Sequence, residues 1–216
     1  MIEAVDNGIQ LMLTGICTAA ALVCAVRSKA RPWFLLGLFS GVFFLGDLYW
    51  MLYLVFYQDT PQHTYISDLS WDASYLFLIL LLLYVREIED SPPAWRPQWS
   101  SLRRLWPAPV FTVGMCAFFM TYGNYVSNIV AAVLMTGLLV VSLEGLRSLS
   151  GESPQKRSLR PVYIVALIFC AAEYGMWICS CFWEGDSLAN PYFWFDLLLS
   201  LTFLLLFAAL RKAVAR

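Results

Sequence analysis

The chain has 216 residues, of which 60% are hydrophobic and only 13% are charged. A water-soluble domain of this length could not cover so much apolar surface, so the composition excludes a soluble enzyme or a soluble binding module. The formal net charge of −1 is uninformative, and no cluster of basic residues is large enough to indicate a nucleic-acid partner.

Apolar stretches of about the length of a membrane span follow one another along the chain. A hydrocarbon layer about 30 Å thick is crossed by roughly 20 apolar residues in a helix. The seven predicted spans are residues 8–26, 32–57, 66–85, 107–122, 125–146, 161–183 and 192–210. Because they use most of the chain, we expect residues 1–216 to form one all-α domain, a seven-transmembrane-helix bundle.

The basic residues predict how this bundle is oriented. All 14 Lys and Arg residues fall in the first, third and fifth connections and in the C-terminal tail. Cytoplasmic loops carry an excess of Lys and Arg, so we expect the N-terminus outside and the C-terminus in the cytoplasm of a plasma-membrane protein. Glu3 and Asp6 precede the first span and basic residues follow it, the reverse of a cleaved signal peptide.

The longest inner connection covers residues 86–106 and contains three prolines that interrupt a helix. After them, Trp and Leu side chains share one helical face, which predicts a short interfacial helix at about 99–106. Residues 147–160 are polar and predict a cytoplasmic loop. These two inner connections are where a cytoplasmic partner or a second copy of the chain would bind.

Five carboxyl groups lie in the middle and outer parts of the predicted spans, which contain no Lys or Arg. They are Asp47, Asp68, Asp72, Glu173 and Asp196. An ionisable residue in mid-bilayer costs about 2.5–3.5 kcal/mol on insertion scales, so each carboxyl group must be protonated, hydrogen-bonded or matched by a ligand. Two structural alternatives stay open: solvation at the outer interface for Asp68 and Asp196, and hydrogen bonding between helices for Asp47 and Glu173.

Aromatic residues stand three or four positions after four of these acids. Carboxylates beside Trp and Tyr faces favour an organic cation, because charge pairing and cation–π contact both strengthen away from water. The same set suits a proton relay, since carboxyl groups bind and release protons. The predicted ligand-binding residues are Asp47, Trp50, Asp68, Asp72, Tyr75, Asn128, Glu173, Trp177 and Asp196.

The second and sixth spans follow a common pattern. Arg31-Pro32 opens one and Arg160-Pro161 the other, and each has an acid in mid-span followed by Trp. Spans 1–3 and 5–7 also have the same predicted orientation, with span 4 as the connector. This pattern indicates a 3+1+3 parallel pseudo-repeat about an axis along the membrane normal, which transporters use. Chance similarity between mid-membrane residues is the alternative.

Three functions remain open. The favoured one is a transporter with an outward-facing pocket for a small cation, with proton coupling as an option. A seven-helix sensor or receptor-like module acting through a cytoplasmic partner is the first alternative, and an intramembrane lipid-modifying enzyme is the second. His63 is the only histidine, which argues against a zinc hydrolase, and the last span has no lysine for a retinal Schiff base. We expect no metal and no cofactor.

Overall fold

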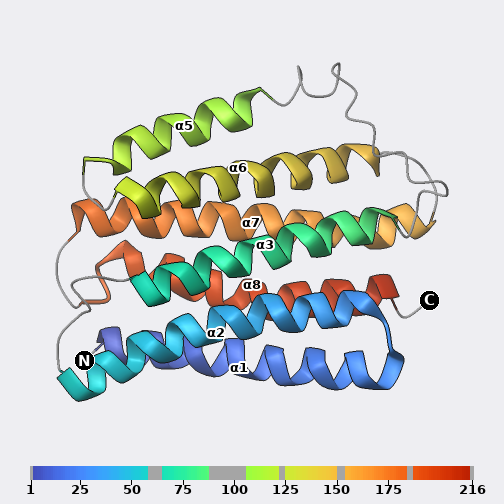
Figure 1. Cartoon of the computed structure of the whole chain (residues 1–216), viewed down its shortest axis with the longest axis horizontal. Helices are drawn as coiled ribbons and strands as arrows, with labels where there is room; N and C mark the ends of the chain where they lie inside the picture. The colour runs from blue at the N-terminus through green and yellow to red at the C-terminus, as the bar shows by residue number, and fades with distance from the viewer. Residues whose placement is uncertain are drawn as a thin grey trace.

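The computed structural model describes residues 2–57, 65–87, 106–121, 125–149, 154–183 and 187–214. The secondary structure of this part of the chain is helical (Figure 1). Its helices are α1 (Ile2–Ser28), α2 (Arg31–Tyr57), α3 (Tyr65–Glu87), α5 (Pro107–Phe119), α6 (Tyr125–Ser148), α7 (Pro154–Phe182) and α8 (Pro191–Val214). The predicted interfacial helix at 99–106 falls outside the described residues, apart from Trp106, which lies in a turn.

Six of the described helices are long and apolar enough to cross a bilayer, with 21–27 residues each. The prediction of an all-α, multi-pass membrane protein is therefore confirmed. The helix α5 has only 13 residues, about 20 Å at 1.5 Å per residue, which is less than the roughly 30 Å of a hydrocarbon layer. The predicted span at 107–122 is thus an apolar helix that ends early, and a count of seven spans stays a prediction.

One predicted loop is largely helical where the structure describes it. Residues 147–160 were predicted to be a polar cytoplasmic loop with no packing signal, yet α6 continues to Ser148 and α7 already begins at Pro154. Proline suits the first turn of a helix, because the amide hydrogen that it lacks would have no partner there. The side chain of Leu159 is buried, so the start of α7 also packs against its neighbours. The prediction of a loop over the whole of 147–160 was wrong.

The long helices form a closed ring. Around it, α1 packs on α2, α2 on α3, α3 on α6, α6 on α7, α7 on α8, and α8 returns to α1. The shorter helix α5 lies outside this ring against α6 (Figure 1). The basic residues of the described segments gather at one end, where α1, α3, α6 and α8 finish and α2 and α7 begin.

Aromatic side chains fill the middle of the ring. Phe39 stacks on Phe203 with ring centroids 4.9 Å apart and meets the edge of Phe169 at 5.5 Å. Phe43 completes the cluster, 4.9 Å from Phe203. All four rings are almost completely buried and join α2, α7 and α8. The two ends of the bundle are therefore separated by a packed apolar layer.

Candidate ligand-binding cavity

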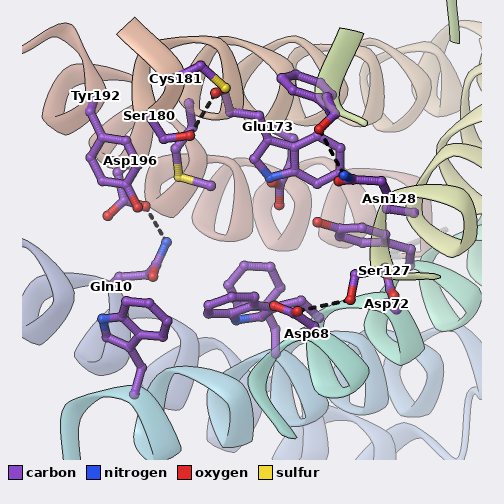
Figure 2. A pocket seen from close by; sticks show the side chains of 18 of the residues that line it. Gln10, Asp68, Asp72, Ser127, Asn128, Glu173, Ser180, Cys181, Tyr192 and Asp196 are labelled. Atoms are coloured by element: carbon purple, nitrogen blue, oxygen red, sulfur yellow. Dashed lines mark hydrogen bonds between the residues drawn. The ribbon is translucent and has the colours of Figure 1, made fainter. Parts of the chain in front are cut away.

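A cavity of about 330 Å³ lies at the end of the bundle away from the basic residues (Figure 2). This volume is at the lower end of the range for small-molecule sites, about 300–1,000 Å³. Every described helix contributes to its wall. The lining residues are Asn7, Gln10, Phe43, Trp50, Asp68, Trp71, Asp72, Tyr75, Phe119, Ser127, Asn128, Ala131, Glu173, Met176, Trp177, Ser180, Cys181, Tyr192 and Asp196.

Eight of the nine residues predicted as ligand-binding line this one cavity. They are Trp50, Asp68, Asp72, Tyr75, Asn128, Glu173, Trp177 and Asp196. The ninth, Asp47, is not among the lining residues. The structure thus brings together side chains from α2, α3, α6, α7 and α8 that are far apart in the sequence. Their role in binding a ligand stays a prediction.

Four carboxyl groups face the cavity from two sides. Figure 2 shows Glu173 and Asp196 on the wall formed by α7 and α8, and Asp68 and Asp72 on the wall formed by α3. Glu173 and Asp196 are only 1% and 2% exposed, whereas Asp68 and Asp72 are half-buried. No Lys, Arg or His occurs among the described residues that line the cavity. The charge of any ionised carboxylate is therefore not balanced by a basic side chain from this wall.

Glu173 is the most buried of the acids that line the cavity. The hydroxyl group of Tyr75 lies beside its carboxyl group, close enough for the two side chains to interact. Tyr75 is itself buried and rests edge-on against Phe169, with ring centroids 5.7 Å apart. The aromatic cluster at the centre of the bundle thus supports the floor of the cavity, and Tyr75 joins that cluster to the acid.

The helix α1 supplies two polar side chains, Asp6 and Gln10, that were not among the predicted binding residues. Gln10 donates a hydrogen bond from its side-chain amide to Asp196, and the carboxyl group of Asp6 also interacts with Asp196. Asp6 is 9% exposed, and its Oδ2 atom is buried with no hydrogen-bond partner in the described part of the chain. The predicted span began at residue 8 and did not include Asp6, whereas the helix α1 begins at Ile2.

Asp47 forms hydrogen bonds that join α2 to its two neighbouring helices, α1 and α3. One of its carboxylate oxygens accepts a hydrogen bond from Thr14 on α1, and the other accepts one from the indole nitrogen of Trp71 on α3, both at 3.1 Å. Its neighbour Gly46 leaves room for this contact, since a Cβ atom there would lie 2.7 Å from the indole nitrogen of Trp71. Asp47 therefore holds the side chain of Trp71, which lines the cavity. This arrangement agrees with the structural alternative given above for Asp47, a hydrogen bond between helices.

Aromatic rings form much of the remaining wall. Trp50 and Trp71 lie side by side with ring centroids 5.9 Å apart. Across the cavity, Phe119 meets Trp177 edge-on at 5.4 Å. The end of α5 is fixed there because the Asn128 side-chain amide donates a hydrogen bond of 3.0 Å to the backbone carbonyl of Phe119. The wall thus presents ring faces from α2, α3, α5 and α7.

Two half-buried acids near the mouth have different surroundings. Asp68 accepts a hydrogen bond of 3.1 Å from the hydroxyl group of Ser127, which joins α3 to α6 (Figure 2). Asp72 lies one helical turn further in. Both acids line the cavity and are half-buried.

Most of the remaining lining residues were missed because such residues are common in any membrane-spanning sequence. Trp71 and Tyr192 do stand at helical spacing from Asp68 and Asp196, and α1 carried a further signal. Its buried residues Asp6, Gln10, Thr14 and Cys17 are three or four positions apart and so share one face. A polar stripe on an otherwise apolar helix predicts contact with a polar interior, and it would have included both Asp6 and Gln10.

Comparison with protein-family models, with curated proteins and with solved structures finds no match. The residues that hold metals most often, His, Cys, Asp and Glu, form no group of three or more suited to a metal ion in the described segments.

Proposed function

We propose that the protein binds a small organic cation in this cavity and carries it across the membrane. The observation that supports this most strongly is the wall itself, in which four carboxyl groups and several aromatic rings surround about 330 Å³ with no basic side chain among the described lining residues. A cation would balance charge that the described wall leaves unbalanced, and it would replace water at the ring faces.

The aromatic content favours an ammonium group over a bare metal ion. Calcium and magnesium require six or more oxygen ligands at short distances, and ring faces supply none. A cation over the face of Trp or Tyr gains about 0.5–2 kcal/mol, more as water is excluded. Trp50, Trp71 and Trp177 line the same cavity as Glu173 and Asp196. A quaternary or alkylated amine uses both kinds of contact at once.

Transport is favoured over binding alone by the arrangement of the helices. The ring runs α1, α2, α3, α6, α7, α8, the order that two parallel three-helix repeats would give if a two-fold axis passed through its centre. Under this relationship α2 corresponds to α7 and α3 to α8, so Asp72 corresponds to Asp196. The positive-inside pattern then gives a cavity open to the outside of the plasma membrane, with the C-terminus in the cytoplasm.

A proton site beside the cation site would supply the coupling. Asp6 and Asp196 interact with each other and are both shielded from water. Two carboxylates in such a place repel each other when both are charged, so one proton shared between them relieves the repulsion. Because Asp196 also lines the cavity, a bound cation and this proton would compete for the same negative charge.

The proposal is tested by binding of tetramethylammonium to the purified protein, followed by the fluorescence of the cavity tryptophans or by calorimetry. Choline and its neutral isostere 3,3-dimethylbutanol form the matched pair of ligands, since they have nearly the same shape and differ in charge. We expect the two cations to bind and the neutral alcohol not to bind. Equal binding of choline and the alcohol would contradict a cation site.

Transport requires a second measurement. Protein in liposomes should accumulate radiolabelled choline in response to a pH gradient, and Glu173→Gln should abolish the accumulation. Glu144→Gln is the control, because Glu144 lies at the opposite end of the bundle in an ion pair with Arg86. Choline binding without any flux would instead favour the seven-helix sensor.

A further inference from the structure

A second cavity lies at the basic end of the bundle. Its volume is about 340 Å³, and it is bounded by the end of α1, the start of α2 and the end of α8. The lining residues are Cys24, Arg27, Ser28, Trp33, Phe207, Arg211 and Val214. The packed aromatic layer in the middle of the ring separates it from the acidic cavity.

The rim of this second cavity is strongly positive. Arg27 and Arg211 line it and are exposed. Lys29, Arg31 and Lys212 are close to them in the sequence, and the segments 24–33 and 207–214 contain no Asp or Glu. Among the described residues, neither Arg27 nor Arg211 forms a salt bridge. Two guanidinium groups from different helices are therefore available to the same ligand.

The interior of the second cavity is apolar. Trp33 is 5% exposed and packs against Phe207 with ring centroids 4.9 Å apart, so this pair forms a fixed surface between α2 and α8. Cys24 and Val214 extend that surface. A ligand suited to both parts combines an anionic group with a hydrocarbon chain.

The other half of the bundle provides an internal comparison. Arg147 and Arg86 lie in the last turns of α6 and α3, as Arg27 and Arg211 lie in the last turns of α1 and α8. There, however, Arg86 pairs with Glu144 at 3.4 Å. Glu144 stands three positions before Arg147, and the residue three positions before Arg27 is Cys24.

In that half of the bundle, side chains fill the space that corresponds to the second cavity. The ring of Tyr163 packs directly on Gly145, where any Cβ atom would overlap it. The hydroxyl group of Tyr163 donates a hydrogen bond of 3.0 Å to the backbone carbonyl of Leu82. One corner is thus packed and holds an ion pair, whereas the corner between α1, α2 and α8 is open and positively charged.

We infer that the second cavity binds an anionic phospholipid of the inner leaflet. The phosphate group lies between the guanidinium groups of Arg27 and Arg211, which match phosphate oxygens in shape and charge. An acyl chain packs on the surface formed by Trp33 and Phe207. Basic pockets between membrane helices on the cytoplasmic side are suited to anionic headgroups for this reason. This site is independent of the proposed cation transport.

Native mass spectrometry of the purified protein tests the inference, with dioleoylphosphatidylglycerol and dioleoylphosphatidylcholine as matched lipids that differ in headgroup charge. We expect tighter binding of the anionic lipid, and a loss of about fivefold in its affinity for each of Arg27→Gln and Arg211→Gln. Arg147→Gln is the control and should leave the affinity unchanged. Cys24→Glu should weaken the binding of the anionic lipid more than Cys24→Gln does. The reason is that it places a carboxylate three positions before Arg27, as Glu144 stands three positions before Arg147.

Three results would overturn the inference. Equal binding of the two lipids would show that the cavity does not select a negative headgroup, a result that needs no variant to fold. An equal loss in Arg147→Gln would show that the whole basic end attracts anionic lipid without a specific site. Displacement of the lipid by equimolar glycerol 1-phosphate would show that the ligand is a free phosphate compound and not a membrane lipid.

Discussion

Gln10 donates a hydrogen bond to the carboxyl group of Asp196, a residue 186 positions further along the chain. The bond joins α1 to α8 and so closes the ring of helices in the wall of the acidic cavity. Asp6, one turn before Gln10, also interacts with Asp196. The contact therefore has two consequences, one for the stability of the bundle and one for the charge of the cavity.

Replacement of Gln10 by leucine should destabilise the bundle by about 1–3 kcal/mol, because the buried carboxyl group of Asp196 loses its amide donor. The free energy of unfolding in mixed micelles, followed by tryptophan fluorescence, measures this effect. The double variant Gln10→Leu/Asp196→Leu should recover most of the loss, since replacing both partners by apolar groups leaves neither side of this hydrogen bond unpaired. Additive losses in the double variant would show that the hydrogen bond does not couple the two residues.

Gly46 should tolerate no side chain. In Gly46→Ala, the new methyl group would meet the indole nitrogen of Trp71 at 2.7 Å, and we expect about 1–3 kcal/mol of destabilisation from the forced shift. Affinity for tetramethylammonium should fall as well, because Trp71 forms part of the cavity wall. Gly114→Ala is the matched control on α5, since nothing lies within 4 Å of a Cβ atom there. Similar losses in the two variants would contradict a role for close packing at Gly46.

Removing the charge of Glu173 should change the affinity for the cation much more than removing the charge of Asp47, although both acids were predicted in mid-span. Glu173→Gln should weaken tetramethylammonium binding at least about tenfold, or 1.4 kcal/mol, because Glu173 faces the cavity. Asp47→Asn should leave the affinity nearly unchanged, since the remaining carbonyl oxygen of the amide can still accept the hydrogen bond from Trp71. Titrations followed by calorimetry compare the two directly. A larger effect in Asp47→Asn would place the cation nearer to Asp47 than the geometry does.

The sequence was sufficient to predict the helical bundle because hydrocarbon thickness and backbone hydrogen bonding leave few ways to arrange long apolar segments. The sequence also indicated residues that meet at one cavity. An acidic side chain within a membrane span costs free energy unless a partner or a ligand compensates it, so such residues stand out. The order of the helices around the ring was not predictable, because it depends on side-chain packing between segments. The predicted span at 107–122 also extended past the end of α5 at Phe119, since no proline or charged residue marks that end in the sequence.

Asp47 and Glu173 show why roles within the site were harder to assign. Each is an acid in the middle of a span with a tryptophan shortly after it. What distinguishes them comes from other helices: Asp47 meets the hydroxyl group of Thr14 and the indole of Trp71, whereas Glu173 faces the cavity beside Tyr75. Hydrogen-bond donors supplied by distant segments cannot be counted from the sequence of the helix that carries the acid.

Cation binding should depend on pH through the carboxyl groups of the cavity. Lowering the pH adds protons that compete with the cation, so the affinity for tetramethylammonium should fall as the pH falls, and binding should release protons to the solution.

Asp196 is the central group, and it interacts with Asp6 from α1, Glu173 from α7 and Tyr192 from its own helix. In Asp6→Asn the carboxyl pair is removed, so fewer protons should be released per bound cation, whereas Glu144→Gln at the opposite end should release the same number as the unaltered protein. Calorimetry in buffers of different ionisation enthalpy counts these protons. An affinity that does not change with pH in the unaltered protein would contradict competition between cation and proton, and with it the proposed coupling.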